Sequence, residues 1–166
     1  MTAAITGGDL TIENQFKQFL SDDESAKAGA PRECGSCTAC CTVLAVDELE
    51  KKNNVPCCHL AGGEGCSIYT TRPGACRQWS CLWLKGGLKG DVRRRPDHLG
   101  LVFSDDVHGP FPMLTAYEVW AGASREPHAK YVLDRLGECC NMVLVDPQNG
   151  FVVSSPNARF KAAMTN

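Results

Sequence analysis

The sequence predicts an α+β protein in which a small antiparallel sheet with one or two helices adjoins a loop-rich lobe of cysteines. Nine of the eleven cysteines fall between positions 34 and 81. Glycines interrupt any regular hydrophobic period from 62 to 90, whereas apolar β-type segments gather in the final third. We therefore predict an N-terminal helix and linker at 1–30 and a cysteine lobe at 31–95. A sheet with a helix follows at 96–166 and is expected to form one compact unit with the lobe.

The size and charge of the chain fit one ordinary domain. A chain of 166 residues buries roughly 70% of its unfolded surface, so its core does not need disulfides. A net charge of −2 with 22% charged residues argues against a globally basic nucleic-acid binder and against a disordered chain. No apolar run approaches the roughly 18 residues of a membrane span. The first residues also lack the basic and apolar regions of a secretory signal.

The use of cysteine indicates a reducing compartment. Eleven is an odd number, so the cysteines cannot all pair within one chain. Three pairs are direct neighbours, at 40–41, 57–58 and 139–140, and a disulfide between neighbours is strained. We therefore predict a cytoplasmic protein with free thiols, with a secreted disulfide scaffold as the alternative.

Short element signals precede and enter the lobe. One helical face within the N-terminal segment is formed by four apolar residues: Ile12, Phe16, Phe19 and Leu20. Residues 42–46 predict a short strand. Asp47 is a candidate cap for a short helix at 49–52. From 55 to 90 the chain is predicted to be mostly loop. Because this segment has few apolar residues to bury, it needs another source of stability, which a coordinated metal would supply.

The final third contains two predicted hairpins. Residues 99–103 and 114–120 read as strands on either side of a turn region. Residues 142–145 and 151–153 read as a second pair around an Asp-Pro-Gln-Asn-Gly turn. Between the hairpins, Ser124 is a candidate cap for a helix that we expect to stop at Gly137. Its apolar face comprises Ala129, Val132, Leu133 and Leu136.

The cysteine run opens with Cys34-x-x-Cys37-x-x-Cys40-Cys41. A Cys-x-x-Cys turn lets two thiolates converge on one ion, and Cys40 adds a third thiolate to the same nest. Thiolates select zinc, copper(I) or iron–sulfur clusters, and structural zinc and [4Fe–4S] clusters each take four protein ligands. With Cys57 set aside, the chain offers up to eight ligands, which permits two four-ligand centres or one centre with spare thiols. The spacing leaves the choice between zinc and iron open.

Four short elements follow one another in a specific order along this segment. They are CxxCxxCC at 34–41, Cys-x-Leu at 58–60, Cys-x-Ile-Tyr at 66–69 and Arg-Pro-x-x-Cys-Arg at 72–77. Together they resemble the YkgJ-type cysteine-cluster family. The resemblance covers under a third of the chain and implies a domain that chelates zinc or iron. It supplies no reaction that can be transferred to this chain.

The resemblance also implies a set of metal ligands. The seven positions that match the family elements are Cys34, Cys37, Cys40, Cys41, Cys58, Cys66 and Cys76. Cys81 is an eighth candidate, five residues after Cys76. Cys57 is the weaker member of its pair because Cys58 stands at the matching position. Arg72 and Arg77 flank Cys76 and are expected either to offset thiolate charge or to pair with surface carboxylates.

Three uses of such a centre remain open. The favoured one is a structural zinc or iron–sulfur centre in an adaptor or accessory protein that binds a protein partner. The alternatives are an iron–sulfur redox or maturation protein, and a metal-dependent enzyme of unknown substrate.

No GxGxxG, GxSxG or HExxH motif is present. A basic stretch at 85–95 lacks a phosphate-binding loop, and His59 beside Cys58 is either a ligand or a solvated side chain.

Overall fold

The computed structural model describes residues 32–60, 62, 65–88, 92–147 and 150–165. The helix that we predict within 1–30 lies outside these residues. The described helices are α2 (Ala39–Val43), α3 (Gly74–Gln78), α4 (Pro96–Leu99), α5 (Pro127–Cys139) and α6 (Ala158–Thr165). The 3-10 helices are η1 (Asp47–Leu49), η2 (Tyr69–Thr71), η3 (Val92–Arg94) and η4 (Ala123–Arg125). The strands are β1 (Leu101–His108), β2 (Phe111–Glu118), β3 (Met142–Asp146) and β4 (Gly150–Ser154).

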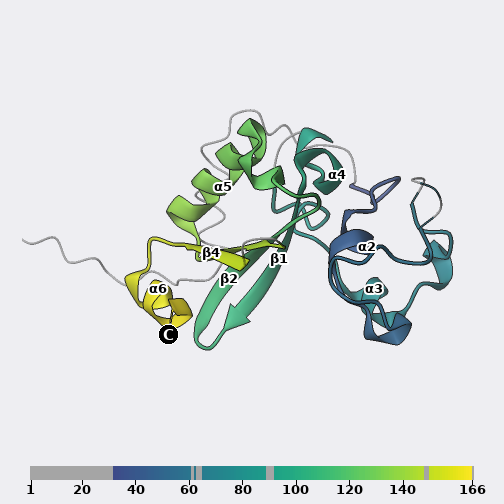
Figure 1. Ribbon diagram of the computed structural model, residues 1–166, viewed down its shortest axis with the longest axis horizontal. Coiled ribbons are helices and arrows are strands. Elements are labelled where there is room, and N and C mark those ends of the chain that lie inside the picture. Colours follow the sequence, from purple (N-terminus) through teal and green to yellow (C-terminus); the bar gives the residue numbers. More distant parts are fainter. Residues whose placement is uncertain (1–31, 61, 63–64, 89–91, 148–149, 166) are drawn as a thin grey trace, which may run out of the picture.

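One four-stranded sheet in the order β1-β2-β3-β4 confirms the α+β class (Figure 1). Both predicted hairpins form, because β1 pairs antiparallel with β2 and β3 pairs antiparallel with β4. The central pairing differs from an all-antiparallel sheet, since β2 and β3 are parallel. The physical reason is the connection between them, because α5 carries the chain back along the sheet before β3 begins. A parallel pair requires such a crossover.

Helix α5 extends two residues beyond its predicted end. Its predicted apolar face is buried as expected: Ala129, Val132, Leu133 and Leu136. Gly137, expected to stop the helix, instead lies inside it and is also buried. A Cβ atom at Gly137 would collide with the hydroxyl group of Ser154 on β4. The glycine therefore permits close approach of helix and strand, and the helix ends at Cys139.

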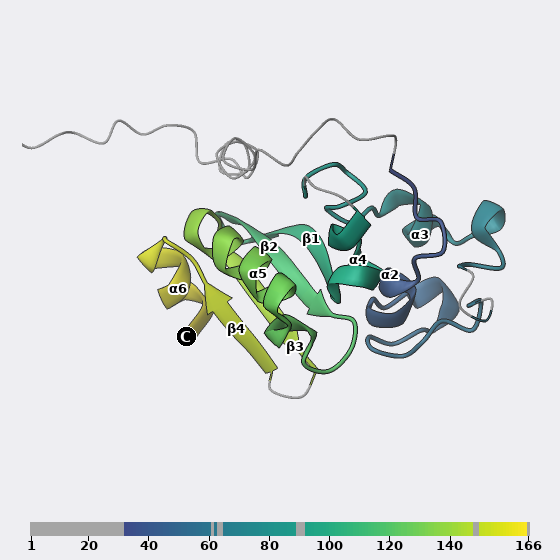
Figure 2. The same ribbon diagram turned by 90° about the horizontal axis from the view of Figure 1, so that it is seen from above.

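The two faces of the sheet are covered by different parts of the chain. Helix α5 packs on one face, where Phe103 and Leu114 belong to its core cluster. On the opposite face Val102 packs against Ala39 and Val43 of α2. The cysteine lobe lies at one end of the molecule, and α6 lies at the other (Figures 1 and 2). The sheet thus joins the lobe to the rest of the chain.

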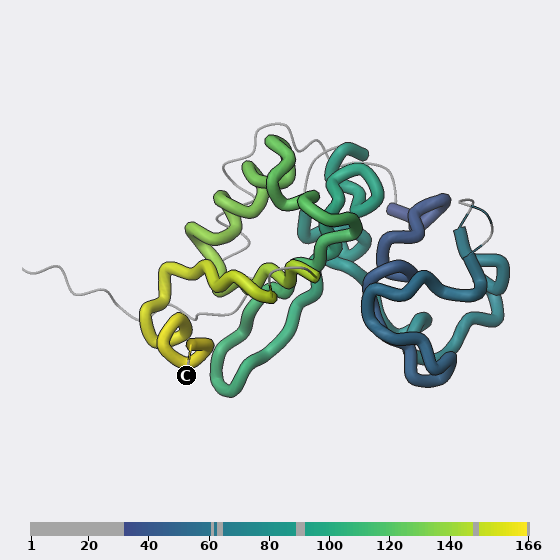
Figure 3. The backbone as a smooth tube through the Cα atoms, viewed as in Figure 1, coloured from purple at the N-terminus to yellow at the C-terminus, as the bar shows by residue number. Residues whose placement is uncertain are grey.

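The first part of the cysteine lobe has almost no apolar core. The described residues between 32 and 80 follow short turns and short helices (Figure 3). Within the described residues from 32 to 81, those that are buried are Ala39, Val43, Lys51 and Gly65. The strand predicted at 42–46 is wrong, because α2 occupies 39–43 and the chain then turns into η1. Ala39 and Val43 are four residues apart, so a helix places both on Val102.

In the part of the chain that the structure describes, no helix has the length and apolar character needed to cross a membrane. The longest helix among the described residues is α5. It has one buried face, and Tyr131 on its other side is exposed to solvent.

Gly100 connects α4 to β1, and replacing it by alanine is expected to lower the free energy of unfolding by at least about 2 kcal/mol. Its φ of +78° is left-handed, and an added Cβ would lie 2.7 Å from the Cβ of Ala123 and from the ring of Trp120. Gly109→Ala is the matched control, because its φ is +56° but nothing lies within 4 Å of an added Cβ. Urea unfolding of both variants separates the two effects. Gly109→Ala introduces only the backbone strain, whereas Gly100→Ala introduces the strain together with steric crowding. Equal losses in the two variants would contradict the predicted contact.

Candidate metal centre

One cavity of about 350 Å³ lies between the cysteine lobe and the sheet. Eight cysteines contribute to its lining: Cys34, Cys37, Cys40, Cys41, Cys57, Cys66, Cys76 and Cys81. All eleven cysteines of the chain are free thiols. Free cysteine is usually a buried residue, yet the eight that line this cavity are all only partly buried. Their gathering at one accessible cavity therefore has no explanation in core packing.

A tight turn and a short helix position the first four thiols. The amide of Cys37 donates to the carbonyl of Cys34 at 2.9 Å, and Gly35 takes a left-handed φ of +52° inside this turn. Helix α2 begins directly afterwards and carries Cys40 and Cys41. The thiols of these two neighbours lie within hydrogen-bonding reach of each other.

The next segment returns beside α2 and delivers Cys57. The amide of Asn54 donates to the carbonyl of Val43, and the amide of Cys57 donates to the carbonyl of Cys41, both at 3.0 Å. The amide of His59 donates to the sulfur of Cys57 at 3.5 Å. This hydrogen bond favours the thiolate form, but burial has the larger effect and raises the pKa of Cys57. Cys57 is therefore held against α2, whereas the side chain of Cys58 is exposed and lies outside the cavity lining.

Two further short elements carry Cys66 and Cys76. Cys66 forms an isolated antiparallel bridge with Leu60. Cys76 lies in α3, whose first amides are capped by a side chain from η1. The carboxylate of Glu48 accepts hydrogen bonds from Gly74 at 3.0 Å and Ala75 at 2.8 Å. These bonds lower the pKa of Glu48 and tie α3 to the segment that follows α2.

Cys81 lies where the lobe joins the sheet. The next residue, Leu82, donates its amide to the carbonyl of Phe103 on β1 at 2.9 Å. Trp79 lines the same cavity and its indole N–H donates to the hydroxyl of Ser104 at 3.4 Å. Cys81 is therefore anchored to β1 through its own chain neighbours.

Burial and mutual proximity raise the pKa of several of these thiols. Burial raises the pKa of Cys37 to about 11, and Asp97 and Cys81 add to the shift. Burial also raises the pKa of Cys76, and the neighbouring thiols of Cys41 and Cys57 raise it further. Cys41 is the exception, because a hydrogen bond from Cys40 lowers its pKa to about 7. The pKa of Cys40 rises for the same reason.

Several cationic side chains surround the thiols. Lys51 is 7% exposed and its Nζ donates to the carbonyls of Thr42, Leu44 and Lys52. Lys51 interacts electrostatically with four of the thiols: Cys40, Cys41, Cys57 and Cys76. Arg72 stacks on the ring of Tyr69 at 4.0 Å and lines the cavity. Its Nε is buried and has no hydrogen-bond partner among the described residues.

This donor set matches a thiolate metal group in chemistry. Thiolates bound to zinc or to an iron–sulfur cluster carry net negative charge, which the buried Lys51 and the unpartnered Nε of Arg72 would offset. The sulfur atoms do not yet converge on common points. Within the described ranges, no three side chains of histidine, cysteine, aspartate or glutamate stand at ligating geometry. Metal binding here would require the thiols to lose protons and draw together.

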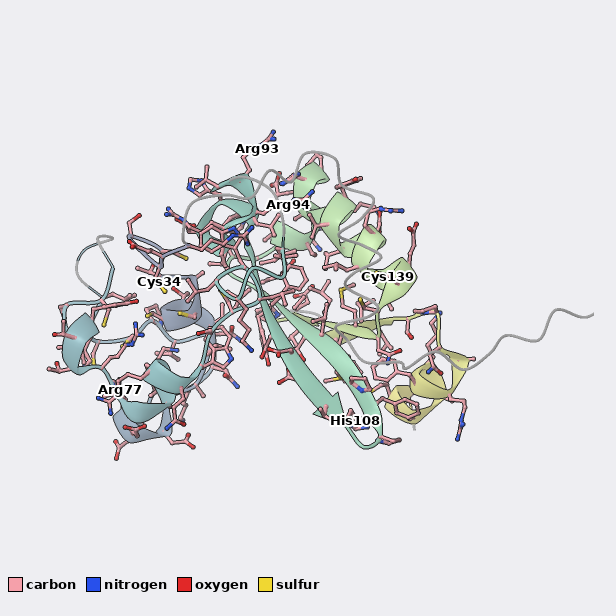
Figure 4. All side chains as sticks on the ribbon, turned by 180° about the vertical axis from the view of Figure 1, so that it is seen from behind. Cys34, Arg77, Arg93, Arg94, His108 and Cys139 are labelled. Atoms are coloured by element: carbon pink, nitrogen blue, oxygen red, sulfur yellow. The ribbon has the colours of Figure 1, made fainter. Side chains whose placement is uncertain are left out.

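The structure brings seven of the eight predicted ligands to one cavity and leaves Cys58 outside it. His59 and Arg72 also line the cavity, whereas Arg77 is exposed on the outer side of the lobe (Figure 4). Lys51 was not identified from the sequence, because nothing in the neighbouring residues indicates that its side chain is buried. The other vicinal pair, Cys139 and Cys140, lies at the end of α5, away from the lobe that holds Cys34 (Figure 4).

The basic stretch of the sequence is partly neutralised. Arg95 forms two hydrogen bonds to the carboxylate of Asp97, at 2.6 and 2.7 Å. Lys85 pairs with Asp105 on β1 at 2.5 Å, and Arg94 is only 7% exposed. Among the described residues of this stretch, Lys85 and Arg95 are therefore paired with carboxylates, whereas Arg93 is exposed.

Comparisons with protein-family models, with curated proteins and with solved structures give no match.

Proposed function

We propose that this chain is a metal-binding protein whose cysteine lobe holds zinc or iron–sulfur centres. In this proposal the centres are structural, and the protein serves as a cytoplasmic adaptor or accessory subunit for a protein partner. The observation that carries the proposal is the gathering of eight partly buried free thiols around one cavity. The four sequence elements that resemble the YkgJ-type cysteine-cluster family support the same chemistry.

The lack of an apolar core in the first part of the lobe supports a structural role. Among the described residues of this part, only two apolar side chains are buried: Val43, which contributes about 1.5–3 kcal/mol, and the single methyl group of Ala39, which contributes roughly 0.8 kcal/mol. Ordering one residue costs roughly 1–2 kcal/mol of backbone entropy. Apolar burial therefore cannot hold the segment from 32 to 81 in one conformation. Structural zinc contributes about 10–16 kcal/mol in small zinc-binding peptides, which is more than these two side chains supply together.

The shape of the cavity favours one alternative, a metal-dependent enzyme. The lining continues beyond the thiols to the sheet, where it includes Ser104, Asp106 and Tyr117. A small molecule that entered between lobe and sheet would meet both these polar groups and the metal. Such an enzyme requires an exchangeable ligand on the metal, whereas the structural role requires every coordination position to be filled by the chain.

Elemental analysis of protein purified without oxygen, with an absorption spectrum of the same sample, tests the proposal. Iron and sulfide with a broad band near roughly 400 nm would identify an iron–sulfur centre. A colourless protein with zinc would identify a closed thiolate site. Protein purified in either form is expected to lose metal as the pH falls. The reason is that thiols with raised pKa values, such as Cys37 at about 11, are protonated near neutral pH and must release protons to bind. A chain without metal would overturn the proposal.

A further inference from the structure

We propose that Cys139 and Cys140, at the end of α5, form a reversible redox pair that exchanges with low-molecular-weight disulfides such as oxidised glutathione. Their sulfur atoms are 3.5 Å apart. Neither residue belongs to the lining of the cavity between lobe and sheet, so this inference does not depend on the proposed function. In this pair Cys139 receives the incoming disulfide, and Cys140 displaces the second half of it.

The two thiols differ in their access to solvent. Cys140 is 1% exposed and belongs to the apolar cluster between α5 and the sheet. Cys139 is only partly buried and packs at the border of the same cluster. A buried cysteine alone would be an ordinary core residue. The contact of its sulfur with a second, accessible sulfur is what core packing does not require, and a reagent from solution meets Cys139 first.

The surroundings of Cys139 help its side chain to lose a proton. As a thiol it donates to the carbonyl groups of Arg135 and Leu136, each at 3.5 Å. As a thiolate it accepts a hydrogen bond from Cys140, and this bond and the guanidinium group of Arg135 outweigh burial and lower the pKa of Cys139. The thiolate is the nucleophile in disulfide exchange. The sulfur that a reagent can reach is therefore also the one that can attack it.

The exchange takes place in two steps. The thiolate of Cys139 attacks one sulfur of the incoming disulfide, so that a mixed disulfide forms and one small thiolate leaves. The thiol of Cys140 then gives its proton to solvent and attacks the sulfur of Cys139, which releases the second small thiolate. The two protein thiols are oxidised to a disulfide, and one small disulfide is reduced to two thiols. The reverse steps restore the pair.

The backbone around the pair makes its disulfide easy to reduce. The amide of Cys140 donates to the carbonyl of Leu136 at 2.7 Å, and the carbonyl of Asn141 accepts the amide of Leu114 at 2.8 Å. The side-chain amide of Asn141 also donates to the carbonyl of Pro112 at 2.8 Å. Neighbouring Cα atoms are only about 3.8 Å apart, whereas those of most disulfides are roughly 4.4–6.8 Å apart. A bond formed on this anchored backbone is strained, and strained disulfides are the labile ones.

One tryptic peptide reports on the pair. Cleavage after Arg135 and Arg159 releases residues 136–159, which contain Cys139 and Cys140 and no other cysteine. Full-length protein purified without oxygen is treated with oxidised glutathione, and its remaining free thiols are then blocked with iodoacetamide. Mass spectrometry is expected to find this peptide unlabelled and lighter by the mass of two hydrogen atoms. Excess reduced glutathione, added before the blocking step, is expected to restore two labelled thiols.

Two serine variants separate the roles of the neighbours. In Cys140→Ser the second step is lost, so we expect glutathione to remain attached to Cys139. In Cys139→Ser, the matched control, the buried thiol of Cys140 is left without its accessible neighbour. We expect no glutathione on the peptide of this variant under the same conditions.

Other results would overturn the proposal. Two labelled thiols in the oxidised parent would show that the pair does not react, and a disulfide from this peptide to a cysteine of the lobe would show that Cys139 and Cys140 are not partners. Glutathione on Cys140 in Cys139→Ser would reject the order of attack. A disulfide that survives excess reduced glutathione would contradict its lability. The measurement on the parent requires no variant and can be read whether or not the lobe holds metal, so a failure of the proposed function leaves it intact.

Discussion

Replacement of Cys37 by serine is expected to release at least half of the bound metal and to unfold the first part of the cysteine lobe. Serine keeps the shape of the side chain, so the packing of Cys37 beside Ala39 and Val102 changes little. The hydroxyl, however, is a poor ligand for the soft metals that thiolates bind. Because the segment has so few buried apolar residues, the lost metal binding energy is lost folding energy.

Elemental analysis measures the first effect, and limited proteolysis of the segment from 32 to 81 measures the second. Cys139→Ser is the matched control. Cys139 donates to the carbonyls of Arg135 and Leu136 at 3.5 Å, and a serine hydroxyl can make the same bonds within the helix. We therefore expect parental metal content and parental resistance to protease in the control. Equal metal content in Cys37→Ser and the parent would reject Cys37 as a ligand.

Replacement of Phe103 by alanine is expected to lower the free energy of unfolding by about 3–5 kcal/mol. Phe103 is 1% exposed and belongs to the cluster that joins α5 to the sheet. Its carbonyl also accepts the amide of Leu82 at 2.9 Å, so the ring lies where the end of the lobe meets β1. Removal of the ring leaves a cavity that the rigid sheet cannot close. The expected loss is a large fraction of the total, because a whole domain has only about 5–15 kcal/mol of stability.

Urea unfolding of the metal-loaded protein measures this loss. Phe151→Ala is the matched control, because Phe151 is 58% exposed on β4 and its removal creates no cavity. We expect the control to change the free energy of unfolding by less than about 1 kcal/mol. A similar loss in both variants would mean that Phe103 does not support the core in the way its burial indicates.

The sheet could be predicted from the sequence because its signals are local. Short apolar runs on either side of turn residues identify both hairpins, and the spacing of Ala129, Val132 and Leu136 identifies α5. The parallel pairing of β2 with β3 could not be predicted, because it depends on where α5 returns the chain. Gly137 was misjudged for a related reason. Its role is set by Ser154 on β4, a residue that is distant in the sequence.

The candidate site could be predicted in part. The spacing of the cysteines identifies the segment that forms the site, because ligands in short turns are close in the sequence as well as in space. The sequence does not indicate which of the neighbours Cys57 and Cys58 lines the cavity, because this depends on a hydrogen bond from the amide of Cys57 to the carbonyl of Cys41. Lys51 could not be found from the sequence, since its burial depends on carbonyl groups that the fold collects around it.

Under the proposed function, the packing of α2 on the sheet would make the lifetime of the protein depend on the supply of metal. Ala39 and Val43 are each 1% exposed because α2 rests on Val102, and the same helix carries Cys40 and Cys41. Under the proposed function, a chain that is not loaded would release α2 and present these apolar residues to solvent. Cellular proteases and chaperones recognise such exposed segments. Scarcity of metal would therefore remove the protein through turnover, and abundance in the cell would follow the metal that the chain has received.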